Sequence, residues 1–151
     1  MIRRFSGEYE FLSNFQFAPV RLDGNFYNHV ENAFQAAKTL DPESRKQIRE
    51  STPRKAKQLG QHVKLRPEWE SIKVRVMLDL VTQKFTHYDH FYNRLMATDT
   101  QELIEGNTWH DNFWGICSCG SCPPSKSGPG KNRLGIILMS IRQGLAHSDR
   151  A

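Results

Sequence analysis

Residues 28–60 read NHVENAFQAAKTLDPESRKQIRESTPRKAKQLG, a stretch that contains the start signals of several short helices. Two dipeptides in it, Asp41-Pro42 and Thr52-Pro53, place a capping side chain directly before a proline, which is favoured at the first position of a helix. Gly60 follows the second start, and glycine is a common helix end. The stretch therefore predicts two helices, the second of which stops at Gly60.

The residues on the N-terminal side of these helices predict a third helix and a β-hairpin. Asn28 can cap a helix whose third residue is Glu31 and which continues to about Leu40. Upstream, residues 20–27 read VRLDGNFY, with Asp23-Gly24 between two short β-prone runs. An Asp-Gly pair in that position favours the tight turn of a hairpin.

Further along the chain, apolar residues recur at helical spacing in three segments, Pro67 to about Phe85, Tyr88 to Ala97 and Asn132 to Ala146. The apolar stripes are Trp69, Ile72, Val76, Leu80 and Val81 in the first, Phe91 and Leu95 in the second, and Leu134, Ile137, Leu138, Ile141 and Leu145 in the third. All these patterns together predict a mainly α (α+β) fold, a helical bundle of about six helices with a small N-terminal β-hairpin.

Length and composition indicate one globular domain over residues 1–151, because no linker or internal repeat divides the chain. The content of 38% hydrophobic and 25% charged residues is ordinary for such a fold, so one core is expected. The N-terminus lacks the apolar run of a signal peptide, and no stretch approaches the ~20 apolar residues of a membrane span. We therefore expect a cytoplasmic protein without membrane contact, and a monomer.

The chain is basic, with a formal net charge of +5 and a pI near 9.3. Such a balance favours partners rich in phosphate, because Lys and Arg neutralise anions and release their counterions. A role in solubility alone is equally compatible with it.

One face of the helix that starts near Asn28 gathers a carboxylate, an amide and an amine. Glu31, Gln35 and Lys38 are three or four residues apart, so they share this face with Phe34. In a cleft, Glu31 would serve as general base and Lys38 as an electrophilic or nucleophilic amine, because burial raises the pKa of a Glu and lowers that of a Lys. The alternative is structural: Glu31 would complete a capping box and Lys38 would complement the helix dipole.

The segment from Gly106 to Gly130 is rich in Gly, Ser, Pro and Cys and lacks periodicity, which predicts a long loop. Its residues 108–115 read TWHDNFWG, in which flat rings can stack on a nucleobase and Asp111 can orient a water or a ribose hydroxyl. The two tryptophans can equally well anchor the loop to the core.

The tract GPGKNR, residues 128–133, fits either an anion site at a helix N-terminus or a plain helix entry.

Three cysteines, Cys117, Cys119 and Cys122, lie close together in this loop and cannot close into an even disulfide framework. A structural zinc site needs four ligands, and His110 is the nearest candidate for the fourth. Zinc bound by these four residues and a set of reduced thiols both fit the spacing.

Catalysis is expected to need no cofactor, because a Glu and a Lys already supply acid–base chemistry.

The order of motifs resembles the NADAR family, which includes the YbiA-like N-glycosidases. The resemblance extends from about Phe5 to Leu145. The matching pieces are residues 11–15 (FLSNF), 31–38 (ENAFQAAK), 69–77 (WESIKVRVM), 111–115 (DNFWG), 130–135 (GKNRLG) and 138–142 (LMSIR). It implies a mainly helical fold with a small N-terminal β element, and cleavage of ribose-to-nitrogen bonds. Residues 118–129 depart from it, because they are longer and richer in Cys and Pro than the Gly-rich link of some members.

The resemblance also implies a set of site residues. The catalytic set is Glu31, Lys38 and Asp111. The ligand-binding set is Asn14, Phe15, Gln35, Trp69, Trp114, Gly115, Lys131 and Asn132.

Two substrates are compatible with the resemblance: ADP-ribose attached to a guanine base of nucleic acid, and a phosphoribosylamino-pyrimidine intermediate of riboflavin biosynthesis. The partner would be ADP-ribosylated nucleic acid or a phosphoribosylated small molecule, and the basic balance favours the first. A third hypothesis, of another class, is a non-catalytic ADP-ribose or NAD-binding module in which Glu31 and Lys38 have no chemical role.

Overall fold

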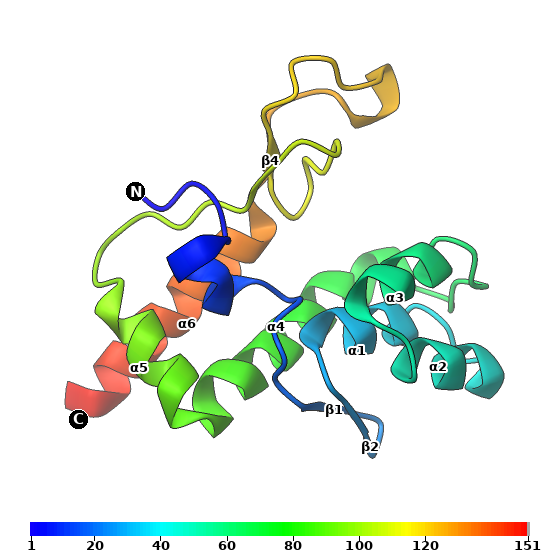
Figure 1. The fold of residues 1–151 in the computed structure, drawn as a ribbon, viewed down its shortest axis with the longest axis horizontal. Helices are drawn as coiled ribbons and strands as arrows, with labels where there is room; N and C mark the ends of the chain where they lie inside the picture. The colour runs from blue at the N-terminus through cyan, green and yellow to red at the C-terminus, as the bar shows by residue number, and fades with distance from the viewer. Residues whose placement is uncertain (151) are drawn as a thin grey trace. The chain divides into compact units, whose positions relative to one another are not determined.

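The computed structural model describes residues 1–150, with side chains through residue 148. These residues form six α-helices, two 3-10 helices and two pairs of short strands (Figure 1). In chain order the elements are η1 (Gly7–Leu12), β1 (Val20–Leu22), β2 (Asn25–Tyr27), α1 (Val30–Ala37), α2 (Pro42–Arg49), α3 (Pro53–Gly60), α4 (Trp69–His87), α5 (Asp89–Ala97), β3 (Gly106–Asn107), β4 (Ile116–Cys117), η2 (Pro124–Lys126) and α6 (Arg133–Arg150). The prediction of a mainly α fold with about six helices and a small N-terminal hairpin is confirmed.

The chain divides into two compact units. The hairpin unit comprises Asn14–Tyr88 and contains β1, β2 and the helices α1 to α4. The loop unit comprises Met1–Ser13 and the chain from Asp89 onward, with η1, α5, β3, β4, η2 and α6. One domain spanning residues 1–151 stays a prediction.

The hairpin unit begins with the predicted hairpin. β1 pairs antiparallel with β2, with Val20 opposite Tyr27, and Asp23 and Gly24 between the strands have φ of 47° and 85°. Positive φ at both central residues defines a type I′ turn, whose twist matches that of the strands. Gly adopts this backbone without strain, which is why Asp-Gly specifies the turn.

Helix α1 is the centre of the hairpin unit: it packs against α2, α3, α4 and β1, and all of its residues are buried. The proline-initiated helices around it begin as predicted. The Asp41 carboxylate accepts the backbone N–H of Ser44 at 3.0 Å. The Thr52 hydroxyl accepts that of Lys55 at 3.2 Å, and the same helix, α3, ends at Gly60.

The start of α1 differs from the prediction. His29, rather than Asn28, is the N-cap residue, and its side chain makes no capping hydrogen bond. The Glu31 carboxylate accepts a hydrogen bond from Gln35, further along the helix, and the backbone N–H of Glu31 donates to the carbonyl of Asn14 at 3.1 Å. The helix also ends at Ala37, earlier than predicted.

The two long helices extend beyond their predicted ends. α4 starts two residues after Pro67 and continues past Phe85, and α6 continues past Ala146. Their stripes lie inward as predicted, with Trp69, Leu80, Val81, Leu134, Ile137, Leu138 and Ile141 buried and Ile72, Val76 and Leu145 half-buried. Across residues 1–150, none of the helices has the length and apolar character needed to cross a bilayer.

In the loop unit, α5 packs against α6 and η1. Ile2 makes backbone hydrogen bonds of 2.8 Å with Glu102 and with Ile104, which join the N-terminus to the segment after α5. The predicted loop, residues 106–130, contains a parallel pair, β3 with β4, and the turn η2. In Figure 1 this segment, drawn yellow to orange, extends away from α5 before it enters α6.

Candidate functional site

Glu31 and Gln35 lie on one face of α1, and Lys38 follows directly after the last residue of that helix. Gln35 Nε2 donates a hydrogen bond of 2.8 Å to Glu31 Oε1. Both side chains are almost inaccessible, because Glu31 is 8% and Gln35 5% exposed. A buried carboxylate that an amide holds in place has the fixed orientation that a general base requires.

Lys38 is half-buried at the C-terminal end of α1. Burial lowers the pKa of its amine below the usual range, while the charge of Glu31 acts in the opposite direction. The amine Nζ lies 6.0 Å from the centre of the Phe34 ring. A lowered pKa increases the share of neutral amine at a given pH, and the neutral amine is the nucleophilic form.

Gly60, at the end of α3, provides the space that Gln35 occupies. A Cβ atom at Gly60 would lie 1.9 Å from Gln35 Oε1 and 2.7 Å from its Cδ, so any larger residue would displace the amide. The same Oε1 is buried and has no hydrogen-bond partner. Gln35 therefore has an unused hydrogen-bond acceptor, while its Nε2 holds Glu31. Sequence reasoning did not assign Gly60 to the site, because its local pattern indicates only a helix end.

The other predicted site residues of the hairpin unit have different surroundings. Trp69 is 5% exposed, and its ring lies 5.3 Å from that of Phe34 with 51° between the planes, which is a core contact. Asn14 is buried and donates from Nδ2 to the sulfur of Met77 at 3.5 Å. Phe15 is 42% exposed. Of these three, Phe15 is therefore the one that solvent reaches.

In the loop unit, Asp111 shapes the turn that carries Trp114. Its Oδ1 accepts the backbone N–H groups of Phe113 at 3.0 Å and Trp114 at 2.9 Å, and its own carbonyl accepts the side-chain amide of Asn107 at 2.8 Å. Such an Asx turn fixes the backbone locally. Trp114 is half-buried, with the edge of one ring toward the face of Phe113 at 4.8 Å between centres.

Gly115 and Asn132, both predicted ligand-binding residues, hold backbone segments together. A Cβ atom at Gly115 would lie 2.1 Å from the carbonyl oxygen of Glu105, so only glycine fits. Asn132 has a left-handed backbone with φ of 49°. Its buried amide accepts the Glu105 N–H at 3.0 Å and donates to the Leu103 carbonyl at 2.9 Å.

The backbone N–H groups at the start of α6 are already used within the chain. Those of residues 131–134 donate to carbonyl oxygens of residues 112–115 at 2.9 to 3.2 Å. These four donors are therefore not available to a phosphate, which favours the helix-entry interpretation of residues 128–133 over the anion site. The exposed side chain of Lys131, whose Nζ lies 5.5 Å from the centre of the Phe113 ring, remains able to contact an anion.

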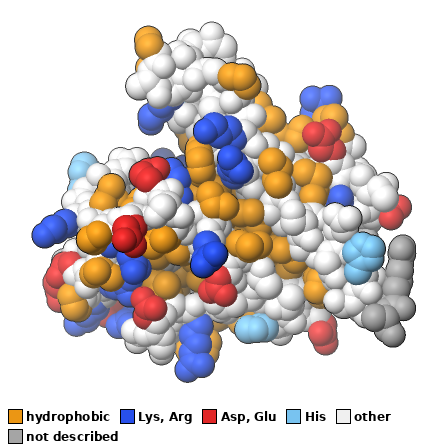
Figure 2. All heavy atoms as spheres, turned by 180° about the vertical axis from the view of Figure 1, so that it is seen from behind, with side chains coloured by type: hydrophobic (Ala, Val, Ile, Leu, Met, Phe, Trp, Pro, Cys, Tyr) orange, Lys and Arg blue, Asp and Glu red, His pale blue; other side chains and the backbone are white. Residues whose placement is uncertain are grey.

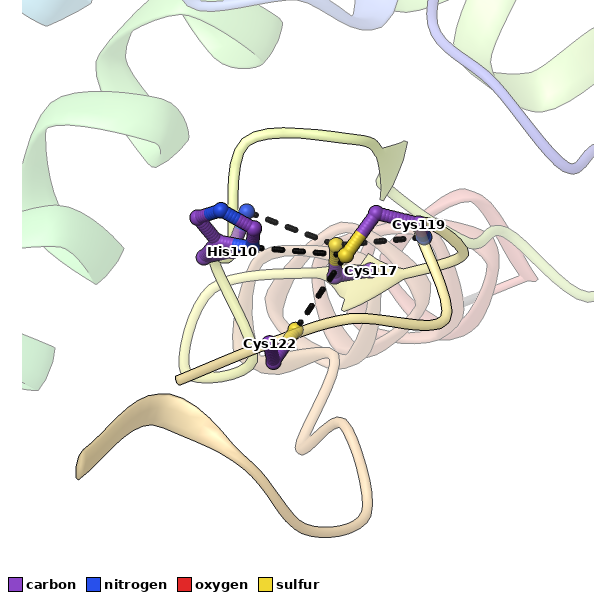
Figure 3. A group of neighbouring side chains, drawn as sticks. All are labelled: His110, Cys117, Cys119 and Cys122. Carbon is purple, nitrogen blue, oxygen red and sulfur yellow. Dashed lines mark hydrogen bonds between the residues drawn. The ribbon is translucent and has the colours of Figure 1, made fainter. Parts of the chain in front are cut away.

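His110, Cys117, Cys119 and Cys122 come together in the loop unit, each half-buried, with one ligand atom from each within 4.8 Å of all the others. Figure 3 shows the three sulfur atoms and the imidazole facing one another. Cys119 Sγ lies 3.3 Å from His110 Nδ1 and 3.6 Å from Cys122 Sγ, and none of the three cysteines forms a disulfide. The cluster is consistent with a structural metal site.

The charged side chains do not gather in one place on the face shown in Figure 2. Lys and Arg side chains are spread over it among acidic and apolar ones. On this face no single basic patch stands out.

The NADAR domain family model matches residues 3–146. The chain belongs to the NADAR family. This NADAR chain is similar to the N-glycosidase YbiA of Shigella flexneri serotype 5b, with 38% identity over 144 residues that cover 93% of the chain and 84% of that protein. It is also similar to the NMR structure of the Escherichia coli protein YbiA, with a TM-score of 0.80 and 33% identity over 99% of this chain and 89% of the other.

One relative of this NADAR chain is named for riboflavin biosynthesis and not for N-glycosidase activity. A riboflavin biosynthesis protein of Vibrio vulnificus is 31% identical to it over 138 residues. The match covers 89% of this chain but 35% of that protein, so the likeness concerns one part of a longer chain.

Proposed function

We propose that this NADAR chain is an N-glycosidase that hydrolyses the bond between ribose C1 and a nitrogen atom, with Glu31 and Lys38 as the reacting groups. The relatives named N-glycosidase confirm the coarser prediction of a hydrolase acting on N-glycosyl bonds. The observation that supports the assignment is the buried Glu31 carboxylate on α1, held by Gln35 at 2.8 Å, together with the partly buried amine of Lys38 directly after the end of that helix.

In the proposed reaction, Glu31 accepts a proton from a water molecule whose oxygen attacks ribose C1. The C1–N bond breaks, and the proton passes from Glu31 to the departing nitrogen. The products are a ribose with a hydroxyl at C1 and the free base. Gln35 acts as a positioning residue, because its hydrogen bond fixes one carboxylate oxygen of Glu31.

Lys38 offers a covalent route to the same products. Its neutral amine bonds to C1, the C1–N bond to the base breaks, and the ring opens to leave an imine between Nζ and C1. The two amine protons go to the ring oxygen and the departing nitrogen. Water then adds to C1 and releases the amine and the C1 aldehyde, and the hydroxyl of the former ring oxygen adds to C1 to close the ring again. Burial supports this role, because it lowers the pKa of Lys38.

The proposed substrate is ADP-ribose attached to a guanine base of nucleic acid. The net charge of +5 supports a polymeric phosphate partner. The contacts expected from the sequence, of Trp114 with a flat base, of Lys131 with a phosphate and of Asp111 with a ribose hydroxyl or water, stay predictions. The second candidate is a phosphoribosylamino-pyrimidine of riboflavin biosynthesis, which is supported by the name of the Vibrio relative.

A panel of N-ribosides followed by mass spectrometry separates these substrates. We expect release of guanine-containing product from an ADP-ribosylated oligonucleotide, with affinity that falls steeply as salt is raised. Faster cleavage of the phosphoribosylamino-pyrimidine would favour the second candidate. Binding of ADP-ribose without product from any riboside in a single-turnover assay would instead identify a non-catalytic module.

The role of Glu31 is tested by Glu31→Gln, which keeps the shape of the side chain but removes the base. Turnover should fall by on the order of 10² or more, while fold and ligand affinity are retained. Glu43→Gln, at an exposed position of α2, is the matched control and should leave turnover unchanged. Near-normal turnover of Glu31→Gln would remove Glu31 from the mechanism.

A further inference from the structure

The loop unit contains a cluster that the proposed glycosidase reaction does not use. We propose that His110, Cys117, Cys119 and Cys122 bind one zinc ion in a closed tetrahedral site that fixes the segment between β3 and α6. Zinc–sulfur bonds of ~2.3 Å and zinc–nitrogen bonds of ~2.0 Å place tetrahedral ligands about 3.8 Å apart for two sulfurs and about 3.5 Å apart for sulfur and nitrogen. The observed separations are 3.6 Å between the sulfurs of Cys119 and Cys122 and 3.3 Å between Cys119 Sγ and His110 Nδ1, and all four ligand atoms lie within 4.8 Å of one another.

Two of the three sulfur atoms, those of Cys117 and Cys119, accept hydrogen bonds from backbone N–H groups. Cys117 Sγ accepts the backbone N–H groups of His110 at 3.3 Å and Cys119 at 3.5 Å. Cys119 Sγ accepts that of Ser121 at 3.3 Å. Each such bond stabilises negative charge on sulfur. A disulfide is the competing use of these cysteines; in this structure Cys119 and Cys122 are not joined by one, and their sulfurs lie 3.6 Å apart.

The donor set identifies both the metal and its role. Three thiolates and an imidazole are a common ligand set of structural zinc. Because the protein supplies all four ligands, no position remains for a reacting water, so the ion does not take part in catalysis. The ion would instead cross-link His110, which precedes the Asp111 turn, to the cysteines that follow it.

Asn112 links this cluster to the entry of α6. Its side-chain Oδ1 accepts the backbone N–H of Cys117, and its Nδ2 donates to the carbonyl of Lys126, each at 2.9 Å. Its own carbonyl accepts the N–H of Lys131 at 2.9 Å. His110 has a left-handed backbone with φ of 69°, which is costly for a residue with a side chain and is compensated when the ring binds metal. Zinc should therefore order the whole segment that ends at Lys131.

Metal content of the full chain tests the site directly. Protein purified with reduced thiols and supplied with zinc should retain about one equivalent after desalting, and cobalt(II) in its place should give the intense absorption of a tetrahedral thiolate site. Cys119→Ser, Cys122→Ser and His110→Ala should each lose most of the metal. His62→Ala, at an exposed position outside the loop unit, is the control that should keep it. Less than a tenth of an equivalent in the unmodified, reduced protein would overturn the proposal.

Proteolysis tests the structural role without reference to glycosidase activity. Lys126 is exposed, so trypsin cleavage after it reports how well the segment is ordered. Removing zinc with a chelator should raise the cleavage rate at least tenfold, and Cys119→Ser should be cleaved at the fast rate with or without chelator. An unchanged rate after complete zinc removal would show that the metal does not order the segment.

Discussion

Gln35 Nε2 and Glu31 Oε1 are joined by a hydrogen bond of 2.8 Å along one turn of α1. Both side chains are buried, and the far side of the Gln35 amide abuts Gly60 of α3. The direction of the Glu31 carboxylate therefore depends on a second helix that carries none of the predicted site residues. A change at Gly60 should reach the carboxylate through the amide.

We expect Gly60→Ala to lower kcat by on the order of 10- to 100-fold with little change in KM. The added Cβ forces Gln35 to move and misplaces Glu31, and small misplacements of catalytic groups have effects of this size. Steady-state kinetics measure the split between kcat and KM. Gly144→Ala is the control, because nothing lies within 4 Å of a Cβ there. Unchanged kcat in Gly60→Ala would show that Gln35 does not position Glu31.

Trp69→Ala should lower the free energy of unfolding by about 3 to 5 kcal/mol, because it removes a buried ring that packs against Phe34. Urea unfolding measures the loss, and Leu65→Ala, at a position 52% exposed, is the control. Ligand affinity is then measured on the folded fraction. Loss of stability with unaltered affinity would make Trp69 a core residue and remove it from the predicted ligand set.

The parts of the fold that the sequence predicts well are specified by adjacent residues. The Asp23-Gly24 turn and the proline-initiated helices after Asp41 and Thr52 depend on φ preferences and caps within a few residues. The start of α1 was predicted wrongly, because the N–H of Glu31 bonds to Asn14, a residue outside any local pattern.

In the site too, the features that adjacent residues specify were predicted, and those that depend on distant segments were not. Helical spacing was enough to place Gln35 beside Glu31, and proximity in the chain was enough to suggest His110 as the fourth member of the cysteine cluster. The same kind of pattern did not reveal that Asn132 bonds two backbone groups or that Gly60 makes room for Gln35. Those functions arise from contacts between segments far apart in the chain, and residue type alone does not encode them.

Stability should depend on pH through Lys84, which is fully buried on α4 and whose pKa burial lowers to about 7 from the usual 10.5. Between these values the unfolded chain binds a proton that the folded chain does not. The free energy of unfolding should therefore rise with pH across this window, by at most about 1.4 kcal/mol per unit from this group, and below pH 7 its contribution is constant.

Urea unfolding at pH 7, 8 and 9 measures the slope. Lys84→Met should flatten it, whereas Lys46→Met, at an exposed position of α2, should not. A slope that is the same in the Lys84 variant and the parent protein would show that this amine is protonated in the folded state throughout the range.

Lys38 should be trapped covalently during turnover. If its amine forms an imine with ribose C1, borohydride reduces the imine to a stable secondary amine, and peptide mapping by mass spectrometry should find the ribose-containing adduct on Lys38. Because burial lowers its pKa, the adduct should form at a pH where an exposed lysine is still protonated, and Lys46 serves as that internal control. Lys38→Arg keeps the charge but cannot form the imine, so loss of turnover in both Lys38→Arg and Lys38→Ala supports the covalent route. Retained turnover in Lys38→Arg alone would reduce the role of Lys38 to electrostatic support, and full activity of Lys38→Ala would leave it only as the residue that ends α1.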